Sequence, residues 1–389
     1  MNLRANDAVL VAAKRTAIGR AFKGSLVDHR GDDLAALAIR AALAEVPELK
    51  ASEVEDLILG CAQPAGEQGY NMARPVTLLA GLNQAAGTTV NRYCASSLQA
   101  LRMAFHAIRA GEAHVQVAAG VEAISRYAHG KADGMEGTKN ERFSQAETEL
   151  PDVYLAMGET AERVADAFEV SRDQMDDYAL ESQRRAGAAI MDGVFEREIV
   201  PVTLADGRIF DRDESPRPST TRDGLAGLRT VFREQGRVTA GNACPLNDGA
   251  AATVVMSGRR VQELEIQPRA RIIASAVSAV DPALMGVGPI ESTRRVLALA
   301  GMTMADVDRV ELNEAFAAQV IPSMDALNIP HERLNVRGGA LALGHPFGMT
   351  GARLVTTLLH TLEDQDLEIG LATLCVGGGQ GMALLLQRL

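Results

Sequence analysis

The stretch Leu371-Ala372-Thr373-Leu374-Cys375-Val376, continued by Gly377-Gly378-Gly379-Gln380-Gly381, places a cysteine between an apolar run and a cluster of glycines. The apolar run predicts a buried strand, and residues 382–389 suffice for one more strand. A dinucleotide-binding fingerprint would need a helix and a complete βαβ unit after the glycines, so the short remainder excludes it. Glycines beside a reactive group instead let backbone N–H groups approach and stabilise an oxyanion.

The same order of patterns occurs twice, about 250 residues apart. The segment 306–312 is similar to 53–59, and each lies between two helical patterns. At nearly the same offset, a glycine–proline turn with His345 matches the position of Cys94, and each residue precedes a helical pattern. We therefore predict a duplicated α/β fold with a nucleophile in one half and a histidine in the other.

Between the two halves, residues 126–242 are rich in charge and carry helical patterns over 160–168 and 174–191. The sequence from Ser171 to Gln174 is typical of a helix cap. This composition predicts an inserted loop domain that covers a site, and a simple linker is the alternative.

The composition of the 389 residues excludes several classes of protein. The net charge of −11, without a basic block, argues against nucleic acid as a partner. The apolar run 8–13 is too short for a signal peptide or a membrane span and predicts a first buried strand. The four cysteines lack zinc-ligand spacing, which disfavours a zinc site. Because we expect no export signal, we also expect the thiols to stay reduced in the cytoplasm.

Cys94 follows a short strand pattern, 88–91, and precedes a strong helical pattern, 97–108. The free N–H groups and dipole of a helix N-terminus favour a thiolate, which is the nucleophilic form of cysteine. The alternative is a buried cysteine that acts as a small apolar side chain.

Three residues of the C-terminal half are further candidates. His345 lies between Gly344 and Pro346, where it could instead be only part of a turn. Cys375 could be a core thiol, and Asn313, at a strand-to-helix junction, could be a helix N-cap.

Taken in their order along the chain, these segments resemble the thiolases, the acetyl-CoA C-acyltransferases. The resemblance extends over nearly the whole chain and rests on Arg15-Thr16 with Gly19, on the residues around Cys94, on 157–162, 238–242, 247–251, 285–289 and 313–316, and on the C-terminal motifs. It implies the thiolase fold, with the two α/β halves in an αβαβα arrangement and a loop domain inserted. The expected domains are 1–121 (completed by about 243–268), 122–242 and 269–389.

The resemblance also implies roles for individual residues. Cys94 accepts the acyl group, and His345 activates first Cys94 and later the thiol of coenzyme A. Cys375 moves the proton at the acetyl carbon, and Asn313 holds a water that stabilises the enolate oxygen together with His345. The backbone N–H groups of Cys94 and Gly377 form a second oxyanion hole for the acyl thioester.

Coenzyme A is expected as a substrate, with no permanently bound cofactor or metal. The resemblance places it against the loop domain, with Arg217 near the nucleotide and Cys244 along the pantetheine channel. It also implies a homodimer or a homotetramer.

The expected reaction is thiolysis of a 3-ketoacyl-CoA, or the reverse Claisen condensation. Ala156 and Cys244 replace a histidine and a serine of short-chain biosynthetic thiolases, which favours the degradative role in β-oxidation. The alternatives are an acetoacetyl-CoA-specific thiolase and a non-catalytic acyl-CoA-binding relative. A condensing enzyme of fatty-acid or polyketide type is disfavoured by Cys375. Ser97, where glycine is frequent in the family, is a further departure.

Overall fold

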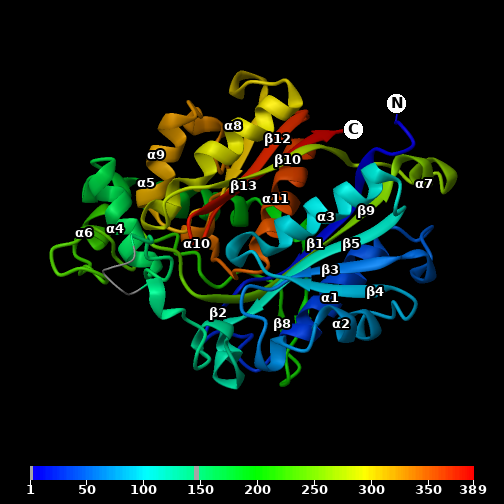
Figure 1. The fold of residues 1–389 in the computed structure, drawn as a ribbon, viewed down its shortest axis with the longest axis horizontal. Coiled ribbons are helices and arrows are strands. Elements are labelled where there is room, and N and C mark those ends of the chain that lie inside the picture. The colour runs from blue at the N-terminus through cyan, green and yellow to red at the C-terminus, as the bar shows by residue number, and fades with distance from the viewer. Residues whose placement is uncertain (1–2, 144–148) are drawn as a thin grey trace.

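The structure, a computed structural model, describes residues 3–143 and 149–389. Within these residues the main sheet has the strand order β11-β12-β13-β10-β1-β9-β5-β3-β4 (Figure 1), with β2 added beside β9 and β6 beside β1. The strands are β1 (Ala8–Thr16), β2 (Gly19–Arg20), β3 (Asp56–Gly60), β4 (Ala86–Val90), β5 (Val115–Ala123), β6 (Ile199–Val200), β9 (Asn247–Ser257), β10 (Ala270–Ala279), β11 (Arg309–Leu312), β12 (Ile369–Val376) and β13 (Gln380–Arg388).

The two halves repeat one strand order, β3-β5-β9-β1 in the first and β11-β12-β13-β10 in the second. In each half the first pair of strands is parallel and the next two pairs are antiparallel. The halves join where Val9 and Leu10 of β1 pair with Arg271 and Ala270 of β10. The duplication predicted from the sequence is therefore confirmed.

Helices separate the two halves of the sheet and cover both outer faces (Figure 1). One outer face packs against α1 (Gly31–Ala44) and α2 (Ala73–Leu79). The other packs against α8 (Gly288–Ala300) and α9 (Ala317–Ala326). Each of these outer layers has its own hydrophobic core, and a further hydrophobic core lies between the halves, around α3 (Ser96–Ala110) and α11 (Thr350–Asp364). This is the expected αβαβα arrangement.

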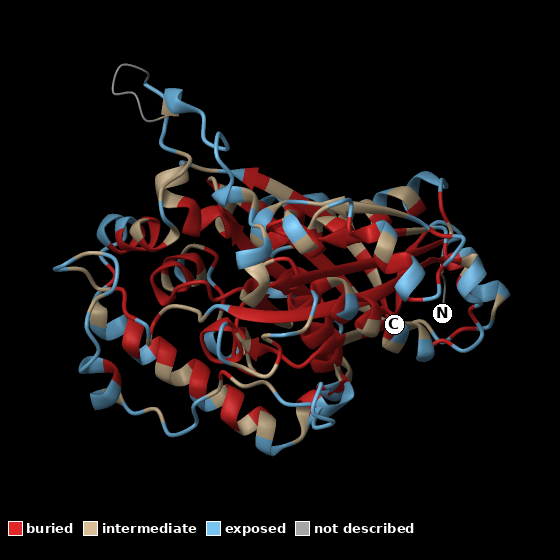
Figure 2. Cartoon of the chain, turned by 90° about the horizontal axis from the view of Figure 1, so that it is seen from below, coloured by how far each residue is buried: buried red, intermediate tan, exposed pale blue. Residues whose placement is uncertain are grey.

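Helix α11 lies at the centre of the molecule and is buried over most of its length. Residues 350–362 are all buried, and Figure 2 shows the centre of the molecule as buried and its periphery as exposed. A helix without a solvated face has to be satisfied by protein on all sides. The hydroxyl groups of Thr356 and Thr361 donate to carbonyls of the preceding turn, so they need no water.

The helices of the inserted loop domain, α4 (Met157–Ala167), α5 (Arg172–Met191) and α6 (Arg222–Ala226), lie at one end of the molecule (Figure 1). Its separate two-stranded sheet, β7 (Val202–Thr203) and β8 (Ile209–Phe210), packs against the core of the first half. The predicted cap of α5 is confirmed, because Ser171 and Gln174 form a reciprocal capping box. Buried Arg15 of β1 pairs with Glu198 and Asp213, which fixes the domain to the first half.

The remaining α-helices of the described residues are two short ones, α7 (Gly258–Glu263) and α10 (Ala340–Leu343). No helix within 3–143 or 149–389 is long and apolar enough to cross a membrane. The predicted domain boundaries stay predictions, and residues 1–2 and 144–148 of the first two domains lie outside the described residues.

Candidate active site

The candidate residues converge at the N-terminal ends of the two central helices. Cys94 lies in a 3-10 turn directly before α3, and His345 precedes α11 by one turn. Asn313 follows β11, and Cys375 is the penultimate residue of β12. The N-cap alternative for Asn313 is wrong, because the N-cap of α9 is Phe316.

The turn before His345 requires glycine at position 344. Gly344 has a φ of 111°, and a Cβ there would lie 2.6 Å from the side chain of Asn247. The Asn247 side-chain oxygen accepts the backbone N–H of His345 at 3.0 Å. This contact fixes the backbone of the histidine to β9 of the first half.

The hydrogen bonds of His345 assign its tautomer. The Thr350 hydroxyl donates to the carbonyl of Pro346 at 2.8 Å, so it accepts from Nδ1–H of His345 at 2.6 Å. Nε2 then carries the lone pair and faces the amide nitrogen of Asn313 at 3.3 Å. Burial, followed by the charge of Arg353, lowers the pKa of His345 to about 3. The imidazole is therefore neutral at physiological pH and can accept a proton at Nε2.

Asn313 combines a fixed backbone with an unused acceptor. It is fully buried, and Gln319 donates to its backbone carbonyl at 2.9 Å. Its Oδ1 has no hydrogen-bond partner among the residues that the structure describes. Buried polar atoms are normally paired, so this oxygen is suited to a water or a substrate group.

Three thiols lie close enough to influence one another. Desolvation raises the pKa of Cys94 to about 12, although the backbone N–H groups of Cys94 and Gly377 act against this shift. Desolvation also raises the pKa of Cys375, and the charges of Cys94 and Cys244 add to it. The expected resting thiolate at Cys94 is wrong: burial outweighs the helix N-terminus, so the thiol has to lose its proton to a base as it reacts.

Iodoacetamide should label Cys94 before Cys61 near pH 7, at a rate that rises with pH. Cys94 is half-buried and Cys61 fully buried, and burial raises the pKa of both thiols. His345→Asn should slow the labelling of Cys94 by roughly a hundredfold, the lower end of the range for loss of a general base. Peptide mapping by mass spectrometry, combined with residual activity, measures both effects. If Cys61 were labelled first with activity intact, Cys94 would not be the nucleophile.

Ser97, one of the departures from the family pattern, has a structural explanation. Its hydroxyl oxygen accepts the backbone N–H of Ala352 at 2.9 Å, which joins the first turns of α3 and α11. Gly120 makes room for it, because a Cβ at position 120 would lie 2.5 Å from the Ser97 Cβ.

The predicted contacts with coenzyme A are spread more widely. Cys244 is half-buried and donates its backbone N–H to the carbonyl of Ala315, two residues after Asn313. Arg217 is exposed in the loop domain, and none of the hydrogen bonds or ion pairs of the described residues joins its side chain to the catalytic candidates. Ala156 is exposed at the N-terminus of α4. The sequence-predicted roles of Arg217 and Cys244 stay predictions.

Thr350 and Glu122 are site residues that the sequence reading did not identify. The signal for Thr350 was its place at the start of the helical pattern after His345. Glu122 is fully buried and accepts backbone N–H groups from Ala62 and Gly348 at 2.8 and 2.9 Å. It thereby fixes the loop after His345 to the first half. A carboxylate inside a strand pattern gives no local sign of this role.

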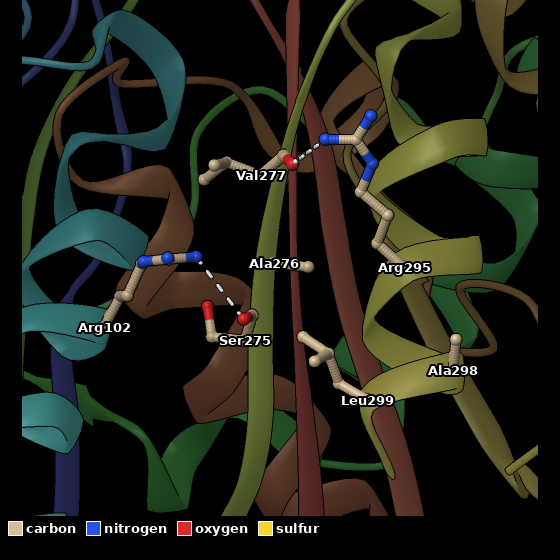
Figure 3. Close-up of a pocket in the computed structure, with 7 residues that line it drawn as sticks. All are labelled: Arg102, Ser275, Ala276, Val277, Arg295, Ala298 and Leu299. Carbon is tan, nitrogen blue, oxygen red and sulfur yellow. Dashed lines mark hydrogen bonds between the residues drawn. The ribbon is translucent and has the colours of Figure 1, made fainter. Parts of the chain in front are cut away.

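A surface pocket of about 470 Å³ lies away from these residues (Figure 3). Arg102 of α3 and Arg295 of α8 reach it from opposite sides and donate to the carbonyls of Ser275 and Val277 in β10. The two guanidinium groups satisfy the edge of β10 where that strand diverges from β1, which is a structural role.

Known proteins are similar to this chain over its whole length. Residues 8–259 match the family described as thiolase, N-terminal domain, and residues 266–388 match the thiolase C-terminal domain. The chain is 43% identical to the 3-oxoadipyl-CoA/3-oxo-5,6-dehydrosuberyl-CoA thiolase of Escherichia coli K12, over 98% of this chain and 99% of the relative. It is 44% identical to the β-ketoadipyl-CoA thiolase of Pseudomonas aeruginosa, over 97% and 98% of the two chains.

An acetyl-CoA acetyltransferase of Escherichia coli K12 is 42% identical over 98% of this chain and 99% of that relative. Among solved structures, human mitochondrial 3-ketoacyl-CoA thiolase in complex with CoA superposes with a TM-score of 0.90 at 34% identity, over 100% of both chains.

Proposed function

Because the chain belongs to the thiolase family of acyltransferases, which use coenzyme A as a substrate, we propose that it cleaves 3-ketoacyl-CoA thioesters by thiolysis. The observation that carries the proposal is the fixed tautomer of His345 between Thr350 and Asn313. In this tautomer His345 is a neutral base near the N-terminal end of the buried helix α11. The thiols of the site require a base because burial raises their pKa.

In the first half-reaction, the Cys94 thiol gives its proton to Nε2 of His345 as the sulfur attacks the 3-keto carbon. The N–H groups of Cys94 and Gly377, which favour negative charge at the Cys94 sulfur, are suited to hold the tetrahedral oxyanion. The C2–C3 bond then breaks and leaves an acyl-enzyme and the enolate of acetyl-CoA.

The enolate takes its proton from Cys375. Its oxygen is stabilised by protonated His345 and by a water on the unpaired Oδ1 of Asn313. The raised pKa of Cys375 suits this role, since a protonated thiol is the form that can act as an acid.

In the second half-reaction the proton on His345 first passes to the Cys375 thiolate. The thiol of coenzyme A then gives its proton to His345 and attacks the acyl-enzyme. Cys94 leaves as the thiolate and recovers the proton from His345, so every group returns to its starting state.

For the acyl chain, we propose the six-carbon dicarboxylic 3-oxoadipyl group. Relatives named for this substrate, at 43% and 44% identity over nearly the whole chain, support it. Ala156 in place of a histidine also leaves a smaller, less polar side chain near the expected thioester. The acetyl-CoA acetyltransferase at 42% identity supports the alternative, an acetoacetyl-CoA thiolase.

Turnover of three substrates tests this proposal. The kcat/KM for 3-oxoadipyl-CoA should exceed that for 3-oxohexanoyl-CoA, which has a methyl in place of the carboxylate, by roughly tenfold or more. The kcat/KM for 3-oxohexanoyl-CoA should in turn match or exceed that for acetoacetyl-CoA, because each buried methylene can contribute up to about 0.8 kcal/mol. A steady fall from the four-carbon substrate upward would instead assign an acetoacetyl-CoA thiolase.

We further propose a homo-oligomer that works in a reducing cytoplasm. The four free cysteines support the reducing compartment, because oxidation would remove both catalytic thiols. Light scattering of the purified protein measures its oligomeric state, and a monomer would contradict the proposal.

A further inference from the structure

A buried ion pair lies close enough to His345 for the charge of its arginine to lower the pKa of the imidazole. Arg353 of α11 and Glu311 of β11 are 1% and 2% exposed, and Nη1 of the arginine donates to Oε2 of the glutamate at 3.0 Å. The free energy of desolvating two charges commonly offsets their attraction, so a buried ion pair is weak evidence for a role in stability. Its position in the fold points to another role.

The two elements that the pair joins are those that carry the partners of the imidazole. Thr350, which accepts from Nδ1, is the first residue of α11 and lies one turn before Arg353. Asn313, which faces Nε2, lies two residues beyond Glu311 at the end of β11. A shift of α11 relative to β11 would therefore move the two partners of His345 apart.

The orientation of the arginine depends on Glu311. Nη2 of Arg353 has no hydrogen-bond partner among the residues that the structure describes. Among the described residues, the hydrogen bond from Nη1 to Glu311 is therefore the side-chain contact that links the arginine to β11. The positive charge held there also disfavours protonation of His345, in the same direction as burial does.

We propose that Arg353 and Glu311 are a positioning pair that holds α11 and β11 in register and thereby keeps His345 in the tautomer with a free Nε2. The inference rests on the proposed function of His345 as the base that activates Cys94. A histidine with its hydrogen on Nε2 could not accept that proton, so loss of the register should lower kcat and leave substrate binding almost unchanged.

The test compares two variants of buried glutamates and one direct control. Glu311→Gln removes the charge at the proposed pair. Glu198→Gln removes a similar charge from the ion pair between Glu198 and Arg15. Glu198 contacts α11 as well, but it does so through the hydroxyl of Thr357, two turns after Thr350. Thr350→Val removes the acceptor for Nδ1–H itself. The seven histidines give a small set of signals when only histidine is labelled with nitrogen-15, and His345→Asn assigns the one of interest.

Without substrate, wild type and Glu198→Gln should show His345 in one tautomer, and Glu311→Gln and Thr350→Val should show a mixture. In steady-state thiolysis, Glu311→Gln should lower kcat by roughly ten- to a hundredfold, with KM within about threefold of wild type. Glu198→Gln should keep kcat within about threefold. If Glu311→Gln does not fold, Arg353→Lys, which keeps the charge but loses the planar fork, is expected to give the same mixture of tautomers.

A single tautomer with near-normal kcat in Glu311→Gln would overturn the positioning role. An equal change in Glu198→Gln would also overturn it, because the effect would then come from general loosening of α11. Since the tautomer is measured without substrate, a wild type that shows one tautomer but no thiolysis would overturn the proposed function and leave the positioning role standing.

Discussion

A Cys94→Ala variant should form no acyl-enzyme and should lower kcat for thiolysis by at least about ten-thousandfold. The reason is that the substrate carbon then has no thiol to attack it and no residue to carry the acyl group between the two half-reactions. Intact-protein mass spectrometry after incubation with an acyl-CoA measures the covalent intermediate, and steady-state kinetics measure the loss.

Cys61→Ala is the matched control. Cys61 is also a buried thiol near the end of a strand, but its sulfur lies against Glu122 rather than against the catalytic candidates. This variant should still form the acyl-enzyme. A covalent acyl group in Cys94→Ala, on any other residue, would contradict the assignment of the nucleophile.

Cys375→Ala should separate the two halves of the reaction. The variant should still transfer an acyl group from a simple acyl-CoA to Cys94, because no carbon–carbon bond is involved. Cleavage of a 3-ketoacyl-CoA should fall by roughly a hundredfold or more, the range for a lost general acid or base. Acyl-enzyme mass and thiolysis rate, measured on the same preparation, give the two values.

The alternative is that Cys375 only packs the end of β12. A folded Cys375→Ala enzyme with near-normal thiolysis would establish that alternative. Loss of both half-reactions together would indicate that the substitution disturbs Gly377 and its N–H group, rather than removing an acid.

Much of the fold could be predicted from the sequence because its signals are local or repeated. The strand–helix spacing near Cys94 and near His345 predicted β4, α3 and α11, and the similarity of 53–59 to 306–312 predicted the duplication. The glycine run and its short remainder correctly indicated that β13, and not a phosphate-binding helix, follows Cys375.

The polar network behind the site could not be predicted in this way. Glu311 and Arg353 are 42 residues apart, and only the packing of α11 on β11 brings them together. In the sequence, an arginine on a helical pattern indicates a solvated face. The burial of α11 on all sides, which depends on both halves, reverses that interpretation.

The protonation state of Cys94 could not be predicted from the sequence either, because it depends on burial in the folded chain. A helix N-terminus can be recognised from the residues that follow, so the sequence predicted a thiolate. Desolvation depends on how segments far apart along the chain pack around the thiol, and it outweighs the backbone N–H groups of Cys94 and Gly377 in setting the direction of the pKa shift. Cys94 is consequently expected to react as a thiol that transfers its proton to a base during the attack, and not as a thiolate that is already present at rest.

The division of the proposed catalytic groups between the two halves has a consequence for biosynthesis. A nascent chain carries Cys94 long before His345 and Cys375 have been made, because synthesis starts at the N-terminus. Strand β13 lies between β12 and β10, so the second half of the main sheet is completed only once residues 380–388 have left the ribosome. Termination before residue 345 would therefore yield a fragment with the thiol and without the proposed base, and such a fragment would not turn over acyl-CoA.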